Sequence, residues 1–350
     1  MALQFYDILE AAKLFGFELS GIVPALPLSQ DYDRYMDWVQ AGHAGRMSYL
    51  TDHRAGVRSD PRNLLPSAKS ILCVGKLYNT PYQYESNERT EGWISRYAWG
   101  EDYHDTIRRD LERLMAHLRT LEDFEYRICV DTAPLLERSY ARMAGLGWIG
   151  KNTCLINQQQ GSWFLLGEVL LSLDLEPGKP PPDRCGSCTR CIDACPTAAI
   201  VSDGERGGWK LDASRCISYF TIELKGAIPE GHRSEIGNHV FGCDICQDVC
   251  PWNRRAPVTD AAEFHPKEGR VSPDLGTLAD LTPAEFRNVF QGSPVSRTRY
   301  SGFLRNVAVA MGNSGSPKFR EPLERLAAAA EDETVRTHAK WALDQIGGDE

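Results

Sequence analysis

The sequence of 350 residues is 42% hydrophobic and 25% charged, an ordinary globular composition that suffices for two or three domains. Its net charge of −9 argues against binding nucleic acid through overall charge, so such binding would need a local basic patch. No apolar run approaches the roughly 20 residues of a membrane span. The N-terminus has neither a secretory pattern nor a twin-arginine pair. These features predict a cytoplasmic protein with no membrane partner.

Residues 1–175 have the pattern of a mixed α/β domain. Over 105–121, apolar residues recur with helical spacing and predict an amphipathic helix. Three short apolar runs rich in β-forming residues, at 70–75, 126–132 and 162–175, predict strands. Helical and extended segments therefore alternate along this part of the chain.

Two further regions follow this domain. The segment 176–184 contains four prolines and predicts a linker, which opens a cysteine-rich region extending to residue 257. Over 258–350, short segments rich in Leu and Ala are joined by Gly, Ser and Pro turns and predict helices. This pattern is typical of one or two units of a helical-repeat stack. It fits a plain helical cap on the cysteine-rich region equally well.

Eight of the 11 cysteines lie between residues 185 and 250. The first four follow the spacing C-x2-C-x2-C-x3-C-P, in which the fourth cysteine of a two-cluster ferredoxin ligates the other cluster. The second run lacks its first cysteine, which Cys216 can supply from a distance. Two crossed ligand sets for 4Fe–4S clusters follow: Cys185, Cys188 and Cys191 with Cys250, and Cys216, Cys243 and Cys246 with Cys195.

Zinc is the weaker alternative, because a zinc site closes with four ligands and has no use for a crossed Cys-Pro pattern. The remaining cysteines, Cys73, Cys129 and Cys154, stand alone in apolar surroundings and are expected to be small buried residues. The polar segment after Cys216 is longer than a ferredoxin needs. It predicts a binding site beside a cluster ligand.

Several stretches outside the cysteine runs identify a family. Among them are "VDTAPLLERSYARMAGLGWIGKNTCLIN" at 130–157 and "CISYFTIELKG" at 216–226. With these stretches the chain resembles the epoxyqueuosine reductases over nearly its whole length. The resemblance implies a multi-domain α/β protein: a cobalamin-binding core at 1–175, a ferredoxin-like domain with two 4Fe–4S clusters at 176–257, and a HEAT-like helical tRNA-binding domain at 258–350.

The same resemblance implies the reaction, the reduction of epoxyqueuosine to queuosine at the wobble position of tRNA. It also implies an external electron donor such as a flavodoxin or ferredoxin, and we expect a monomer to suffice. Two other functions fit part of the pattern. A reductive dehalogenase shares the cofactors but does not need a basic helical tail, and an electron carrier does not need the long segment before the clusters.

Asp131 is the candidate catalytic residue. Loss of oxygen from an epoxide is easiest when a general acid protonates the leaving oxygen. Asp131 ends an apolar strand, where partial desolvation is expected to raise the pKa of its carboxyl. The alternative is a helix cap, because aspartate is a favoured N-cap residue and a helical segment follows. The resemblance implies that Asp131 is the proton donor.

The expected cobalamin contacts come from several segments. The sequence has no D-x-H-x-x-G loop that would supply a histidine to cobalt, so we expect an open axial face on the cobalt. His104 is expected to be a structural histidine. A broad apolar ligand with amide arms suits aromatic and polar side chains. The predicted contacts are Tyr97, Asp131, Asn152, Leu155, Ser162, Ser218 and Asp244.

A basic stretch in the C-terminal region predicts the tRNA contacts. Between Phe286 and Arg320 the sequence has six basic residues and no acidic ones, a local density that phosphate binding requires. A solvated basic face is the alternative. The predicted phosphate contacts are Lys225, Arg254, Arg297, Arg299 and Arg305.

Overall fold

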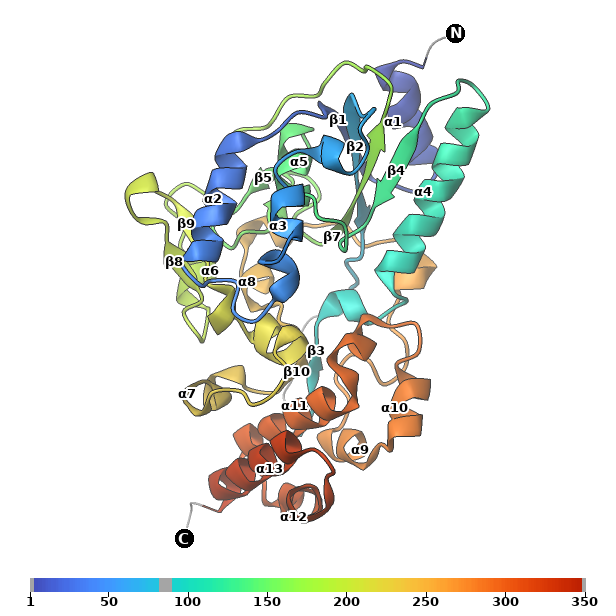
Figure 1. Ribbon diagram of the computed structural model, residues 1–350. Coiled ribbons are helices and arrows are strands. Elements are labelled where there is room, and N and C mark those ends of the chain that lie inside the picture. The colour runs from blue at the N-terminus through green and yellow to red at the C-terminus, as the bar shows by residue number, and fades with distance from the viewer. Residues whose placement is uncertain (1–2, 82–89, 348–350) are drawn as a thin grey trace.

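The computed structural model describes residues 3–81 and 90–347. Figure 1 shows an upper part built around a β-sheet, a cysteine-rich part at its left, and a group of helices below. The two ends of the chain lie at opposite ends of the molecule. The functional site lies where these three parts meet.

The central sheet has four strands in the order β1 (Leu19–Pro24), β2 (Ser70–Leu77), β7 (Phe164–Leu171) and β4 (Tyr126–Cys129). Each strand is antiparallel to its neighbour. Every residue of β2 is buried, as expected for a central strand covered on both faces. The three strands predicted from the sequence are confirmed.

Helices cover both faces of this sheet. On one face lie α1 (Phe5–Leu14) and α4 (Tyr103–Arg119), which confirms the helix predicted at 105–121. Gly167 of β7 permits the close approach of α4, because an added Cβ would lie 2.8 Å from a methyl carbon of Ile107. The short helix α5 (Glu137–Met143) packs on the other face.

The segment 25–66 connects the sheet to the cysteine-rich part. It contains α2 (Ser29–Gln40) and α3 (Arg54–Val57), which lie beside the cysteine-rich part in Figure 1. The indole of Trp38 donates a hydrogen bond of 2.5 Å to the carbonyl of Leu211. This contact fixes α2 against the cysteine-rich part.

The cysteine-rich part consists of short elements. Two four-residue helices, α6 (Arg190–Asp193) and α8 (Ile245–Asp248), pack against each other, one from each cysteine run. Two small hairpins and a short helix complete it; these elements are β5 (Trp148–Ile149), β6 (Leu155–Ile156), β8 (Ile200–Ser202), β9 (Trp209–Leu211) and α7 (Glu230–Arg233). Residues Tyr219–Glu223 form a π-helix, a form frequent at functional sites.

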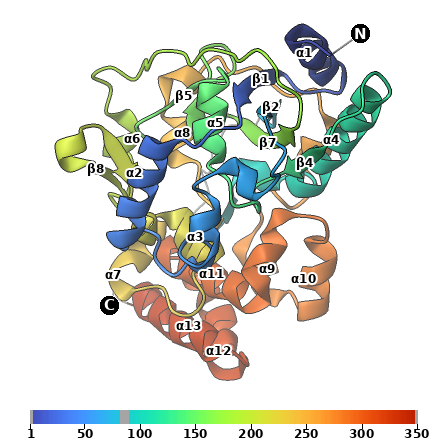
Figure 2. The same ribbon diagram turned by 45° about the horizontal axis from the view of Figure 1, so that its top comes forward.

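The lower part is helical and contains α9 (Leu275–Asp280), α10 (Pro283–Val289), α11 (Arg299–Ser314), α12 (Arg320–Ala329) and α13 (Glu333–Ile346). Figure 2 shows α12 and α13 on the far side of α11 from the sheet. No helix in the described ranges is long and apolar enough to cross a membrane.

The core of the lower part includes residues from much earlier in the sequence. Trp93 and Trp99 are buried in it, together with Phe241. Trp93 lies in β3 (Trp93–Ile94), Trp99 follows that strand, and Phe241 lies in β10 (His239–Phe241). The strands β3 and β10 pair in parallel. The helical part therefore does not form its core from 258–350 alone. The helices predicted there are confirmed, whereas their arrangement as HEAT-like repeats stays a prediction.

Candidate active site and cluster-binding region

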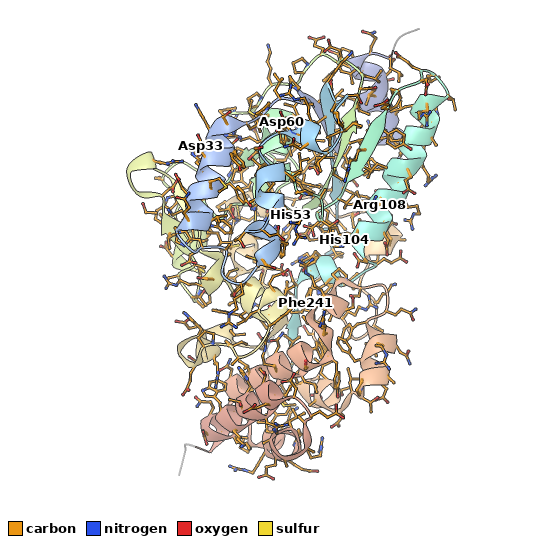
Figure 3. The ribbon with its side chains drawn as sticks, viewed as in Figure 1. Asp33, His53, Asp60, His104, Arg108 and Phe241 are labelled. Carbon is orange, nitrogen blue, oxygen red and sulfur yellow. The ribbon has the colours of Figure 1, made fainter. Side chains whose placement is uncertain are left out.

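A cavity of about 770 Å³ lies between the sheet, the π-helix and the start of the helical part. Figure 3 places His104 and Arg108 at the lower end of α4, above the helical part that contains Phe241. The cavity is lined by aromatic and apolar side chains together with four acidic groups, a histidine and several arginines. They include Tyr49, Arg54, Arg58, Tyr97, Asp102, Tyr103, His104, Arg108, Asp131, Ile222, Glu223 and Arg297.

Asp131 lies two residues after the end of β4, at the start of the loop that leads to α5. Its backbone has φ +52°, a left-handed conformation that is uncommon for any residue except glycine. Its carboxylate oxygen Oδ2 lies 3.0 Å from His104 Nε2. The side chain of Asp131 is 44% exposed, so its carboxylate remains accessible from the cavity.

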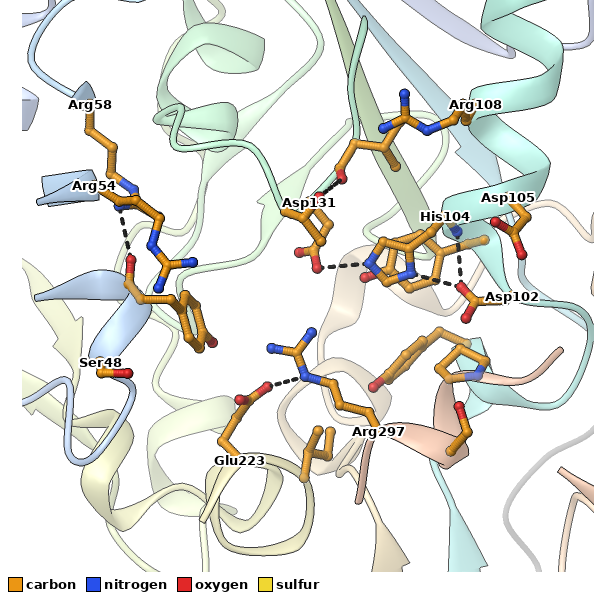
Figure 4. Close-up of a pocket in the computed structure, with 18 residues that line it drawn as sticks. Ser48, Arg54, Arg58, Asp102, His104, Asp105, Arg108, Asp131, Glu223 and Arg297 are labelled. Atoms are coloured by element: carbon orange, nitrogen blue, oxygen red, sulfur yellow. Dashed lines mark hydrogen bonds and ion pairs between the residues drawn. The ribbon is translucent and has the colours of Figure 1, made fainter. Parts of the chain in front are cut away.

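His104 joins two carboxylates. Its Nδ1 lies 2.7 Å from Asp102 Oδ1, while its Nε2 faces Asp131 (Figure 4). Burial opposes protonation of the ring and lowers its pKa. The hydrogen bonds and charges of the two carboxylates outweigh this effect and raise the pKa of His104 to about 9. At neutral pH this carboxylate–imidazole chain (Asp102, His104 and Asp131) therefore holds a proton on the imidazole.

Two expectations about these residues are wrong. Burial raises the pKa of Asp131, as expected, but His104, Tyr103 and the charge of Arg297 reverse that effect, and the net pKa is lowered. Asp131 is not a helix cap either, because α5 begins at Glu137 with Leu136 in the capping position. The sequence did not reveal that His104, expected to be only structural, would contact the candidate acid.

Arginines make one side of the cavity positive. Arg297 extends into the cavity toward Asp131 (Figure 4), and its Nε lies 2.8 Å from Glu223 Oε1. Its guanidinium also lies over the ring of Tyr49, 5.6 Å from the centroid. Arg58 is buried and donates to the carbonyl of Tyr49. Of the arginines that line the cavity, only Arg297 was predicted as a functional residue from the sequence.

The cavity is connected to the cysteine region through the π-helix. Ile222 and Glu223 line the cavity, and the π-helix containing them starts three residues after Cys216. Ser218 lies in between and hydrogen-bonds to the Cys216 thiol. The polar segment after Cys216 thus joins a predicted cluster ligand to the cavity wall.

The eight clustered cysteines are free thiols, and they lie in two groups of neighbours. Cys191 interacts with Cys185, Cys188 and Cys250. Cys243 interacts with Cys216 and Cys195, and Cys246 with Cys216 and Cys243. The assignment of these cysteines to two crossed cluster sites stays a prediction. In the described part of the chain, no group of three such side chains would hold a single metal ion.

The three remaining cysteines differ from one another. Cys73 and Cys129 are fully buried in the sheet, as expected. Cys154 is half-buried, and its thiol lies near that of Cys246. The expectation of an isolated apolar environment is therefore wrong for Cys154, because the β5–β6 turn brings it to the second cysteine run.

Of the predicted cobalamin contacts, Tyr97 and Asp131 line the cavity. The polar groups of three others are engaged within the protein. Asn152 donates to the carbonyl of Cys246, Ser162 bonds to Asn253 and Gln247, and both oxygens of Asp244 accept hydrogen bonds from residues 95 and 96. Leu155 is buried in the core beside the sheet.

One predicted tRNA contact is wrong. The side chain of Arg305 is 2% exposed, and its guanidinium donates to the carbonyls of Phe220, Leu224 and Gly226. It therefore clamps the segment after Cys216 and cannot reach a phosphate. Arg299 lies six residues earlier, on the exposed side of α11. Clustering along the sequence did not distinguish these two faces.

The other basic candidates lie at the surface. Lys225 is exposed on the turn that Arg305 holds, and Arg254 is exposed directly after the second cysteine run. Arg297 is 39% exposed while paired with Glu223. Of these candidates, Arg297 lines the cavity.

Comparison with known proteins identifies the relatives of this chain. Residues 184–253 match a family described as a 4Fe-4S double cluster binding domain, and residues 58–132 match one described as Epoxyqueuosine reductase QueG, DUF1730. The epoxyqueuosine reductase of Xanthomonas campestris is 42% identical over 346 residues, which cover 96% of this chain and 94% of the relative. The chain belongs to the epoxyqueuosine reductase family.

Two solved epoxyqueuosine reductases have the same fold. One, in complex with an epoxyqueuosine-modified tRNA-Tyr stem loop, has a TM-score of 0.90 and 32% identity, covering 98% of this chain and 90% of its own. The other, from Bacillus subtilis, was captured with its aspartate catalytic loop swung out of the active site. Its TM-score is 0.89 and its identity 31%, with coverage of 97% and 90%. This protein is accordingly an oxidoreductase that carries a double-cluster domain.

Proposed function

We propose that this protein reduces epoxyqueuosine to queuosine in tRNA, and that Asp131 and His104 together supply a proton to the leaving oxygen. Family membership and the solved relative with its modified stem loop support the substrate. The observation that carries the residue assignment is the carboxylate–imidazole chain at the cavity. Neither a dehalogenase nor an electron carrier is favoured by these relatives.

The overall reaction sets what the site must deliver. Conversion of an epoxide to an alkene takes up two electrons and two protons and releases one water. Asp131 presents an accessible carboxylate to the cavity, and His104 behind it holds a proton at neutral pH. Transfer of that proton through the Asp131 carboxylate neutralises the developing alkoxide. Asp102 then stabilises the neutral imidazole that remains, through its hydrogen bond to His104.

The cavity suits the cobalamin that the family resemblance implies. Tyr97 and Tyr103 offer aromatic surface, and Arg297 and Ser296 offer polar groups for amide arms. His104 is the one histidine among the lining residues, and both its ring nitrogens face carboxylates, so no lining imidazole is available to cobalt. Bound cobalamin supplies a reduced cobalt centre, and the protein contributes position and electrostatics. Contacts of cobalamin with Asn152, Leu155, Ser162, Ser218 and Asp244 stay predictions.

The clusters would carry electrons from an external donor to this cavity. We assign one 4Fe–4S cluster to Cys185, Cys188, Cys191 and Cys250, and the second to Cys195, Cys216, Cys243 and Cys246. The second set is the one whose ligand loop continues into the cavity wall, and for this reason we put it last in the proposed electron path. A flavodoxin or ferredoxin remains our predicted donor, and a monomer our predicted active form.

The tRNA would be held by exposed basic side chains around the cavity. Lys225, Arg254, Arg297 and Arg299 remain the proposed phosphate contacts, and Arg305 is withdrawn. Phosphate contacts fix orientation without reading sequence. They would therefore direct the modified base to the cavity and leave its recognition to the lining residues.

The Asp131→Asn variant tests the proposal, because it preserves shape and removes the proton-transferring carboxylate. We expect turnover of an epoxyqueuosine-containing stem loop to fall roughly 10²–10⁴-fold, while corrin absorbance and tRNA affinity stay unchanged. The control is Asp123→Asn at a highly exposed site on the surface. Normal turnover by Asp131→Asn would remove Asp131 from the proton path.

A further inference from the structure

The tip of the β5–β6 hairpin contacts the first cysteine run. Lys151 lies in the turn between the two strands. Its ammonium nitrogen Nζ donates to the carbonyl of Gly186 at 2.7 Å and to that of Cys188 at 2.9 Å. Among the residues that the structure describes, no carboxylate forms an ion pair with this ammonium. The loop of the first run is therefore held by a cation whose charge no ion pair neutralises.

The body of the same hairpin packs beside two proposed ligands of the first cluster. Trp148 of β5 and Ile156 of β6 are buried together with Cys250, and Cys185 packs against them. These two cysteines come from different runs, as the proposed crossed set requires. The hairpin thus contacts the ligand thiols through its strands and the ligand loop through Lys151 at its tip.

The turn that carries Lys151 is itself fixed. The backbone N–H of Gly150 donates to the carbonyl of Cys154 and closes the turn. The next residue, Asn152, is 4% exposed, and its amide donates to the carbonyl of Cys246 in the second run. Two adjacent residues of the turn therefore hold one cysteine run each, and the Lys151 charge stays at a defined place.

We propose that Lys151 is a positioning residue for the loop of the first cluster, and that its charge raises the reduction potential of that cluster. The inference rests on the proposed assignment of this cluster to Cys185, Cys188, Cys191 and Cys250. Reduction adds one electron, supplied by an external flavin or iron–sulfur protein, and makes the cluster one unit more negative. A nearby positive charge stabilises the reduced form more than the oxidised form. The first cluster thereby accepts electrons from the donor more readily.

The test compares four variants of the full-length protein with both clusters reconstituted. Lys151→Arg keeps the charge and the donors, Lys151→Gln keeps a donor and removes the charge, and Lys151→Met removes both. Lys13→Met removes an exposed lysine from α1, which packs on the sheet, and serves as the matched control. Melting temperature and iron content identify any variant that fails to fold or to load its clusters.

The charge is tested by a redox titration followed by electron paramagnetic resonance, which gives the midpoint potential of each cluster. We expect one potential to fall by about 59 mV in Lys151→Gln and Lys151→Met, a tenfold change in the ratio of reduced to oxidised cluster for a one-electron couple. Lys151→Arg and Lys13→Met should keep both wild-type potentials. Unchanged potentials in the two neutral variants, or an equal shift of both potentials, would overturn the proposal. If Lys151→Met does not load its clusters, the comparison of Lys151→Gln with Lys151→Arg decides in the same way.

The positioning role is tested by the release of iron to a chelator. Lys151→Met leaves the carbonyls of Gly186 and Cys188 without their charged donor, so about four irons per chain should be released roughly tenfold faster than in the wild type. Lys151→Arg and Lys13→Met should release iron at the wild-type rate. An unchanged rate in Lys151→Met rejects the positioning role.

Two comparisons separate this inference from the proposals around it. The midpoint potential that responds to Lys151 should be the one that persists in Cys216→Ala, which keeps only the first cluster. If the responding potential is the one lost in Cys216→Ala, the charge acts on the second cluster and the proposal is wrong. The titration requires no tRNA, so a wild type without turnover of the stem loop would contradict the proposed reaction and not this inference.

Discussion

The cysteine-rich part and the cavity are both reactive, but they are assembled in different ways. Seven of the eight cluster cysteines stand in two short runs whose spacing brings the thiols together within one or two turns of chain. The cavity receives its groups from 48–58, 97–108, 130–132, 222–223 and 294–297. The first site depends on local spacing, whereas the second depends on the packing of three parts of the molecule.

This difference predicts how each site fails. A cluster site should fail when one of its own thiols is removed, with little effect on the other parts. The cavity should respond to residues that only hold its segments in place, such as Arg305. Four substitutions, ordered from the largest expected effect to the smallest, can break or sharpen this contrast.

Replacing Cys216 with Ala should have the largest effect. The variant loses a ligand of the cluster whose loop forms the cavity wall, so we expect turnover to become undetectable and iron content to fall from about eight to about four per chain. Iron analysis and electron paramagnetic resonance measure the outcome. Cys73→Ala, a buried cysteine outside the runs, should retain its iron. Near eight irons in Cys216→Ala would contradict the crossed assignment.

The same contrast explains what the sequence could predict. The strands and the long helix follow from periodicity, and the structure agrees with them. The crossed cysteine sets follow from spacing and stay a prediction. The environment of Asp131 did not follow, because His104 reaches it across 27 residues and reverses the sign of its pKa shift. The left-handed conformation of Asp131 also results from tertiary packing. Likewise, the sequence shows the basic stretch, but it does not show that Arg305 faces inward.

Replacing His104 with Gln should have the next largest effect. Gln keeps a polar side chain between the carboxylates but carries no transferable proton, so we expect kcat to fall roughly 10–100-fold. In the wild type, kcat should decline as the pH rises through about 9, because His104 then loses its proton. The variant should lack this alkaline limb. If the alkaline decline of kcat persists in His104→Gln, that decline belongs to another titrating group.

His104 should also link stability to pH. Its pKa is raised from 6.5 to about 9 in the folded protein, so its contribution is full below about 6.5 and is lost as the pH rises through about 9. Denaturant unfolding of the wild type and His104→Gln across this window measures the contribution. The difference between the two free energies of unfolding should shrink toward alkaline pH.

Replacing Arg305 with Met should act on the structure rather than on tRNA binding. Three buried carbonyls of the segment 220–226 would lose their donor, at a cost of about 3 kcal/mol or more in the free energy of unfolding. Because this segment follows Cys216, iron at the second cluster should become easier to remove with a chelator. A stable variant with weakened tRNA binding alone would restore the original prediction for Arg305.

Replacing Arg299 with Met should have the smallest effect, and it is the matched partner of Arg305→Met on the same helix. Arg299 is exposed, so its loss leaves no buried acceptor unpaired, and stability and iron content should stay at wild-type values. If Arg299 holds one phosphate, stem-loop affinity should fall a few-fold, and the slope of log K against log salt should flatten by about one unit. Turnover at saturating stem loop should be unaffected, because the cavity is intact. An unchanged salt slope would mean that Arg299 belongs to a solvated face and that the phosphates are held elsewhere around the cavity.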